Sequence, residues 1–251
     1  MKSLIRLLLV SALLAPAALI AATFEGKVSM TMTSGKGKPQ QITYRVKGDK
    51  VRMEFPDQKD AGGIVMDTTK REMMMFMDEQ KMYMVMALPD AAKEAIEKQA
   101  QDVQLEKTND TEKILGYTAT KWIMREKNGT ETEMWLAEGL GTFMGFSGNK
   151  NPMSRGREPA APAWERALAG KDAFPLRVVG YEKGALASKG KSADHKSDKA
   201  KGKAKLGAGE SFRMEVTAVD KSSQPDSLFN APPGYQKFDM GGMMKGLIPG
   251  R

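Results

Sequence analysis

The residues with the clearest chemical potential in this chain of 251 residues are its methionines, seven of which lie between Arg71 and Pro89. The thioether sulfur is a soft ligand that favours Cu(I). Methionine is also a flexible apolar side chain that suits pockets of adaptable shape and fills gaps in a core. The segment therefore has three interpretations: a copper site, an apolar ligand pocket, or ordinary core packing.

The spacing of these methionines predicts a β-hairpin with one face covered by their side chains, because alternate residues of a strand point to the same side of a sheet. Three methionines alternate in each of two successive strands: Met73, Met75 and Met77, then Met82, Met84 and Met86. If residues 78–81 form the loop, each of the first three lies opposite one of the second three, about 5 Å away, starting with Met77 opposite Met82. We call these six residues the methionine face.

A methionine face of this size must be covered. Burial of one methionine side chain stabilises a fold by about 1.5–3 kcal/mol, so six amount to roughly 10–15 kcal/mol, comparable with the net stability of a whole domain. The cover is the protein's own core, an apolar ligand such as an acyl chain, or Cu(I). The copper alternative uses four of the six as ligands: Met75, Met77, Met82 and Met84. No cofactor is expected otherwise.

The chain has few residues of the types that catalyse reactions, which argues against an enzyme. The chain contains no cysteine, and its only histidine, His195, lies in a lysine-rich segment that would not hold it in a fixed geometry. The paired carboxylates Glu131 and Glu133 fall on an expected solvent face. Gly139 and Gly141 lack the strand–loop–helix setting and the lysine of a phosphate-binding loop. We predict no catalytic residues.

Residues 1–22 are typical of a secretory signal. Lys2 and Arg6 precede a long apolar run that ends in small residues. This run is shorter than the roughly 20 apolar residues of a spanning helix, and Pro16 interrupts it. The lack of cysteine excludes a disulfide framework and a lipidated cysteine. We therefore predict an exported protein that is soluble, after cleavage, in the periplasm or outside the cell.

A lysine-rich segment, residues 186–209, carries much of the chain's positive charge, with seven lysines and two aspartates. Its low complexity predicts a disordered insertion. The lysines from Lys189 to Lys205 would attract an anionic envelope surface, which leaves a structural envelope protein as a further alternative. No aromatic side chains alternate with the lysines, so we do not expect nucleic acid as a partner.

Strand patterns dominate the rest of the mature chain, with two helices among them. The main helix is expected at Asp90–Gln101, and its apolar stripe continues to Val103. A short helix is expected around Trp164. The sequence thus predicts one β-dominated α+β domain, residues 23–238, followed by a flexible tail, residues 239–251.

A second hairpin is predicted around Asn128 and Gly129. This pair of residues is the preferred one for a two-residue turn between antiparallel strands. That turn would place Trp122 directly opposite Trp135, so both indoles would share one face of the sheet.

The order of several short motifs resembles an exported bacterial family known only as a domain of unknown function. These motifs include FEGKVSM, VKGDKVRMEF, GGIVMD, ILGYTATKW and EMWLAEGLG. The most telling are Gly116-Tyr117 and the terminal LFNAPPGY, from Leu228 to Tyr235. The layout is also similar to the periplasmic lipoprotein-carrier superfamily, the LolA/LolB-like half-barrels, over most of the mature chain.

This resemblance implies a strongly curved antiparallel sheet, a half-barrel, wrapped around one main and one short helix, with an apolar cavity between sheet and helices. It implies that Asp90–Gln101 and the short helix form a lid. The expected function is a non-catalytic binding protein for a lipid or the acyl chain of a lipoprotein. The expected ligand-binding residues are Met73, Met75, Met77, Met82, Met84, Met86, Trp122, Trp135 and Trp164.

Overall fold

A computed structural model of the protein describes residues 24–35, 37–57, 62–87, 103–145, 162–168, 171–186 and 206–238. Its strands are β1 (Gly26–Ser34), β2 (Gln40–Lys47), β3 (Lys50–Glu54), β4 (Gly63–Asp67), β5 (Glu72–Met77), β6 (Met82–Ala87), β7 (Val103–Ile114), β8 (Tyr117–Glu126), β9 (Glu131–Ala137), β10 (Phe174–Tyr181), β11 (Glu210–Asp220) and β12 (Gln236–Lys237). The helical elements are α2 (Ala163–Leu168) and the 3₁₀ turn η2 (Asp226–Phe229).

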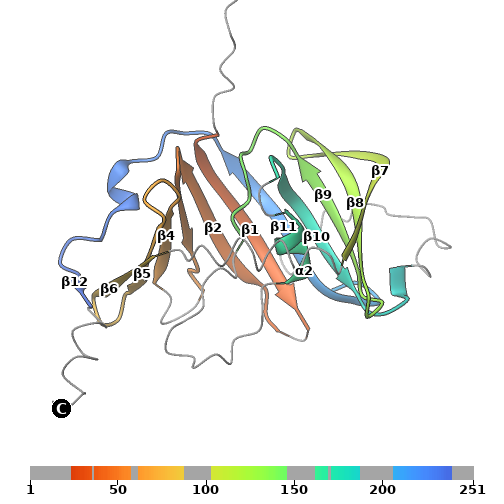
Figure 1. Ribbon diagram of the computed structural model, residues 1–251, viewed down its shortest axis with the longest axis horizontal. Coiled ribbons are helices and arrows are strands. Elements are labelled where there is room, and N and C mark those ends of the chain that lie inside the picture. The colour runs from red at the N-terminus through yellow and green to blue at the C-terminus, as the bar shows by residue number, and fades with distance from the viewer. Residues whose placement is uncertain are drawn as a thin grey trace, which may run out of the picture.

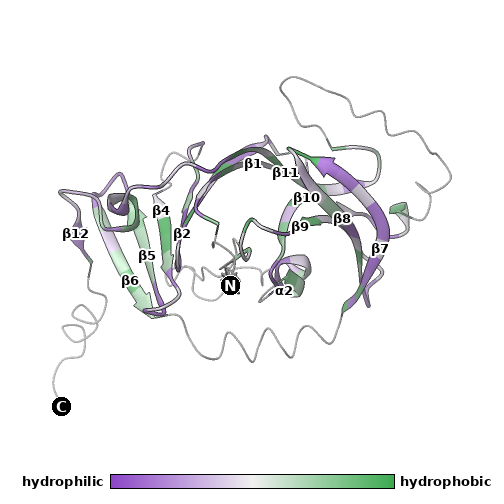
Figure 2. Ribbon diagram, turned by 90° about the horizontal axis from the view of Figure 1, so that it is seen from above, coloured by the Kyte–Doolittle hydropathy of each residue, from purple (hydrophilic) through white to green (hydrophobic). Residues whose placement is uncertain are grey.

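The strands form one sheet in the order β12-β6-β5-β4-β3-β2-β1-β11-β10-β9-β8-β7. All neighbours are antiparallel except β12, which pairs with β6 in parallel over two residues. The sheet is strongly curved and open, and α2 lies inside the curve (Figures 1 and 2). The predicted fold class, a β-dominated curved antiparallel sheet, is confirmed.

The curve gives the sheet an inner face, toward α2, and an outer face. The main core cluster forms on the inner face, where Trp164 and Leu168 of α2 join strand residues such as Tyr44, Val178 and Met214. The strands can contribute to this core because their side chains alternate between the two faces. In β2, for example, every second residue from Ile42 onward is buried. The inner face is therefore the core side of the molecule.

The sequence pattern does not predict the strand β7. The expected extension of the helical stripe to Val103 is wrong, because β7 begins at that residue. Only Ile114 among its residues is buried, because β7 lies at the edge of the sheet and is hydrophilic (Figure 2). A register shift between Lys107 and Thr111 also interrupts its alternation. A polar, bulged edge strand carries little of the periodicity on which strand prediction depends.

The predicted turn between β8 and β9 is also wrong by one residue. Glu126 and Thr130 close the hairpin, with the Glu126 N–H donating to the Thr130 carbonyl at 2.9 Å, so the loop has three residues. Gly129 takes φ +86° in this loop, as the last position of a three-residue loop requires. Because the register differs by one residue from the expected one, each residue of β8 faces a residue of β9 whose side chain was expected on the opposite face of the sheet. Trp122 consequently pairs with Met134.

Several predictions fall outside the described residues. They concern the signal at 1–22, the main helix at Asp90–Gln101, most of the lysine-rich insertion (187–205) and the tail, 239–251. Within the described parts of the chain, no helix is long and apolar enough to cross a membrane.

Candidate ligand-binding site

The methionine face forms as the spacing predicts. β5 and β6 are joined by residues 78–81, and their register places Met73 opposite Met86, Met75 opposite Met84 and Met77 opposite Met82. Met73 and Met84 are 4% and 5% exposed. The other four, Met75, Met77, Met82 and Met86, are only half-buried. The hairpin therefore carries an unbroken row of cross-strand methionine pairs.

The methionine face lies on the inner side of the sheet. Met73 belongs to the main core cluster, and Met75 and Met86 pack against it. The register continues the same face into the neighbouring strands, where Ile64 lies opposite Met75 and Met53 opposite Ile64. An apolar wall thus extends from the hairpin across β4 to β3.

The outer face of the same hairpin is covered by the C-terminal segment. Phe76 packs with Val65 and Phe229 in a second cluster, and the Tyr235 ring meets the Phe76 ring edge-on at 6.3 Å. The Arg52 guanidinium lies 5.1 Å from the centre of the Phe76 ring and donates to the Leu228 carbonyl at 2.7 Å. The terminal motif from Leu228 to Tyr235 therefore supports the hairpin from outside.

Ionic contacts attach this C-terminal segment to β2. Lys47 lies 2.8 Å from Asp226 and donates to the Gln224 carbonyl at 2.7 Å. The hydrogen bond from Lys47 holds the pKa of Asp226 below its usual range. Arg45 donates to the Gln224 side chain at 2.8 Å. These contacts fix the segment that covers the outer face.

The centre of the inner face is filled by the protein's own aromatic side chains. Trp164 of α2 stacks on Phe143 at 5.6 Å and on Phe212 of β11 at 6.0 Å. Tyr44 stacks on Phe143 at 5.8 Å and meets Phe174 edge-on at 5.5 Å. We call these five residues the aromatic cluster. It joins α2 to β2, β10 and β11 and occupies the centre of the inner face.

The Tyr44 hydroxyl ties a loop into the aromatic cluster. It accepts a hydrogen bond from the Met144 backbone N–H at 3.0 Å, and the whole Tyr44 side chain is buried. Burial raises the pKa of Tyr44 well above its ordinary value, because the phenolate would lose its hydration. The loop residue Phe143 is thereby held against Trp164.

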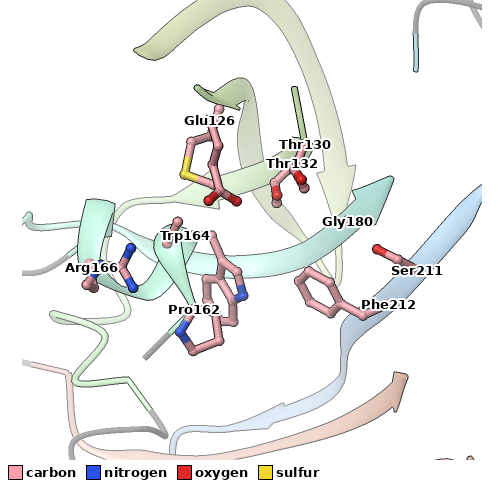
Figure 3. Close-up of a pocket in the computed structure, with 11 residues that line it drawn as sticks. Glu126, Thr130, Thr132, Pro162, Trp164, Arg166, Gly180, Ser211 and Phe212 are labelled. Atoms are coloured by element: carbon pink, nitrogen blue, oxygen red, sulfur yellow. The ribbon is translucent and has the colours of Figure 1, made fainter. Parts of the chain in front are cut away.

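A pocket of about 340 Å³ lies between α2 and the strands β8 to β11 (Figure 3). Trp164 and Phe212 form part of its wall, while Glu126 and Arg166 bring charged groups to it. The remaining lining residues are Met124, Thr130, Thr132, Pro162, Ala163, Gly180 and Ser211. Sequence reasoning found Trp164 but missed Glu126, Arg166 and Phe212, which carry no motif and meet only in the folded chain.

The three tryptophans expected in the wall take three different positions. Trp122 points to the inner face with Met134, and Trp164 is buried in the aromatic cluster. Trp135 pairs with Lys121 and Arg177, so it lies on the opposite face from Met134. Its indole N–H donates to Glu133 at 2.8 Å. The inner wall therefore contains Trp122 and Trp164, whereas Trp135 belongs to a polar network.

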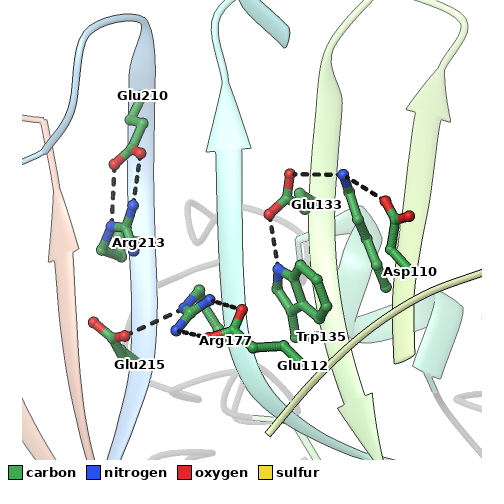
Figure 4. A network of polar contacts seen from close by, with 9 residues as sticks. Asp110, Glu112, Glu133, Trp135, Arg177, Glu210, Arg213 and Glu215 are labelled. Carbon is green, nitrogen blue, oxygen red and sulfur yellow. Dashed lines mark hydrogen bonds and ion pairs between the residues drawn. The ribbon is translucent and has the colours of Figure 1, made fainter. Parts of the chain in front are cut away.

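That polar network links strands on the face opposite to Met134 (Figure 4). Arg177 binds both oxygens of Glu112, at 2.8 and 3.2 Å, and its Nε donates to Glu215 at 3.2 Å. Lys121 lies 3.4 Å from Asp110 and 3.7 Å from Glu133. Arg213 pairs with Glu210 at 2.7 Å. Charges of opposite sign face one another, which ties β7 to β11 by way of β10.

The described parts of the chain contain no group of three or more His, Asp or Glu side chains that could bind a metal ion. The cross-strand methionine pairs of the β5–β6 hairpin offer soft ligands instead. The four positions of the copper alternative come together as two adjacent pairs: Met75 with Met84 and Met77 with Met82.

The fold and this site define a β-dominated half-barrel protein with a methionine-covered inner wall. The chain belongs to the family described as Domain of unknown function (DUF4412), whose sequence profile matches residues 24–235. The predicted relationship to a family of unknown function is thereby confirmed. No curated protein sequence matches the chain significantly.

Several solved structures have a similar fold. An uncharacterized conserved protein from Thermus thermophilus has a TM-score of 0.46 and 10% identity, over 87% of this chain and 91% of that one. MucB of Pseudomonas aeruginosa, solved with MucA, has a TM-score of 0.44 and 11% identity, over 86% of this chain and 58% of that one. A LolA superfamily protein from Nitrosomonas europaea has a TM-score of 0.30 and 12% identity, over 83% and 90%. These similarities are weak, and nothing about a ligand follows from them.

Proposed function

We propose that the protein is a non-catalytic periplasmic binding protein that holds an apolar ligand, a lipid or the acyl chain of a lipoprotein, against the methionine face. The observation that carries the proposal is the partial exposure of Met75, Met77, Met82 and Met86 on the inner side of a curved sheet. Side chains that serve only as core are more deeply buried elsewhere on this face, as are Met30 and Met53, each 1% exposed.

The construction around the methionine face supports this function. Its outer side is covered by Phe229 and Tyr235, so the hairpin is held in place without help from the inner side. The aromatic cluster fills the centre of the inner face, on β2, β10 and β11, and so bounds one side of the wall formed by β3 to β6. Unbranched thioether side chains adapt to chains of different length and unsaturation. The ligand would be sequestered in a largely preformed apolar site.

Binding of a fluorescent fatty acid tests the proposal. The double variant Met75→Gln with Met77→Gln puts uncompensated amides against the ligand, and we expect about tenfold weaker binding. Met74→Gln is the matched control, because Met74 is also half-buried but packs with the outer cluster. Native mass spectrometry of gently purified protein should show co-purified lipid. Protein that is always empty and binds no fatty acid would contradict the proposal.

A second candidate function is the binding of Cu(I), which the register of the methionine pairs favours. Met75 faces Met84 and Met77 faces Met82, so four sulfur ligands lie on adjacent positions of one hairpin. Titration of Cu(I) against a competing chelator measures this affinity. Replacing these four methionines with leucine should abolish copper binding while sparing fatty-acid binding and folding, because leucine keeps the volume and apolar character. Unchanged protein that binds fatty acid but not Cu(I) would favour the lipid ligand.

A further inference from the structure

The described methionines differ sharply in how far the whole residue is exposed to solvent. Met30, Met53, Met134 and Met214 are at most 1% exposed. In contrast, four of the six residues of the methionine face are half-buried: Met75, Met77, Met82 and Met86. The chain contains no cysteine, so the methionine thioethers are its only sulfur groups. They can be oxidised to sulfoxides. A small oxidant that enters the inner face therefore meets these four sulfur atoms before the buried ones.

From this arrangement we propose that Met75, Met77, Met82 and Met86 are sites of reversible oxidation to methionine sulfoxide by hydrogen peroxide, a modification that turns the apolar inner wall polar. In each reaction, the sulfur lone pair attacks one peroxide oxygen and the O–O bond breaks. The sulfur first carries a hydroxyl group and a positive charge, and the departing hydroxide takes the proton of that hydroxyl group, which leaves the sulfoxide and water. Sulfur is oxidised by two electrons and the peroxide is reduced by two.

The strand β4, next to Met75, offers no side-chain partner to a sulfoxide oxygen. The facing residues Ile64 and Met66 are apolar, and they pair with Met75 and Met73 on the neighbouring strand. The backbone N–H groups of β5 point along the sheet to its antiparallel neighbours β4 and β6. A sulfoxide at Met75 must therefore bring water onto the wall, since a buried polar group without a partner is costly.

The effect on a ligand rests on the proposed function. An acyl chain that lies against the methionine face would lose its apolar contacts and meet four polar groups. We expect fatty-acid affinity to fall by about tenfold or more after oxidation. Reduction by a pair of methionine sulfoxide reductases, one for each sulfoxide epimer, should restore binding.

Peptide mapping by mass spectrometry tests the modification sites without any ligand. The full-length protein is treated with hydrogen peroxide, digested at intervals and scored for added oxygen at each methionine. We expect the four positions to be oxidised at least about tenfold faster than Met30, Met53 and Met134, in line with their exposure. Oxidation that proceeds at the same rate at buried and half-buried positions, or that spares these four, would overturn the proposal.

The functional consequence is tested with two variants. Replacing Met75, Met77, Met82 and Met86 with leucine should leave the protein folded and its fatty-acid binding insensitive to peroxide. The control variant replaces Met32, Met74 and Met144, which are also half-buried but lie outside the methionine face; its binding should remain sensitive. If the control variant is the protected one, the proposal is wrong. If untreated protein binds no fatty acid, the proposed function fails, while the mapping still decides the oxidation sites.

Discussion

At the scale of single residues, Tyr44 shows how a buried polar group is used to position a loop. Its hydroxyl accepts the Met144 N–H at 3.0 Å within the aromatic cluster. We predict that Tyr44→Phe lowers the free energy of unfolding by about 1–2 kcal/mol, because the ring remains but the buried N–H loses its acceptor. Tyr235→Phe, whose hydroxyl donates to Asp78 in an exposed setting, should cost less than about 0.5 kcal/mol. Urea denaturation measures both, and equal losses would contradict the prediction.

The buried phenols also predict how stability depends on alkaline pH. Burial raises the pKa of Tyr44, and burial together with the charge of Glu133 raises the pKa of Tyr181. In the unfolded chain both phenols ionise near pH 10, so above that pH the unfolded state binds fewer protons than the folded state. Their contribution to stability is therefore complete below about pH 10 and declines above it. Denaturation between about pH 8 and 11 should show this decline, with a shallower slope in Tyr44→Phe; an identical slope would contradict it.

At the scale of elements, the network around Arg177 ties β7, β10 and β11 together. Arg177 makes two bonds to Glu112 and one to Glu215, and its side chain is 20% exposed. We predict that Arg177→Met lowers the free energy of unfolding by about 2 kcal/mol, because two carboxylates lose their partner. Arg125, which is 44% exposed and also binds two glutamates, is the matched control. Arg125→Met should cost less than about 1 kcal/mol by the same denaturation measurement, and a larger loss than for Arg177→Met would refute the argument.

The two hairpins show how much of the sheet was predictable from sequence. The β5–β6 register followed correctly because the methionine alternation on both sides leaves only residues 78–81 for the loop. The β8–β9 register did not, since Asn128-Gly129 also fits a three-residue loop in which Gly129 is the last residue. Turn chemistry alone does not distinguish these loops. The alternation of apolar residues does not decide the register either, because charged and apolar residues face each other across the two strands, as Glu133 and Ile123 do.

At the scale of the whole molecule, the candidate site was predictable only in part. The methionine face is formed by two strands adjacent in sequence, so local alternation was sufficient to find it. The pocket between α2 and β8 to β11 joins Glu126, Arg166 and Phe212, which are far apart in the chain. The side of the sheet that is concave depends on the packing of α2 and the aromatic cluster, and no local pattern reports that.

The position of the tryptophans in the whole fold allows a test of where a ligand lies. Trp122 and Trp164 belong to the inner side of the sheet, whereas Trp135 lies in the polar network on the opposite face. Bromine quenches indole fluorescence only at short range. Trp164 contacts Phe143, which stacks on Tyr44 of β2, so it is nearer the methionine face than Trp122 of β8. A brominated fatty acid on the methionine face should therefore quench Trp164 rather than Trp122.

We predict that Trp164→Phe reduces the quenching and that Trp135→Phe keeps it, with the fluorescence of each variant measured across a titration of the brominated fatty acid. Trp122→Phe should also keep the quenching, because Trp122 lies on β8, in the limb of the sheet away from the methionine face. Quenching that disappears only in Trp135→Phe would place the ligand on the outer face and would separate the methionine face from binding. Quenching retained by Trp135→Phe and reduced by Trp164→Phe requires a ligand inside the curve, since the sheet itself stands between that ligand and Trp135.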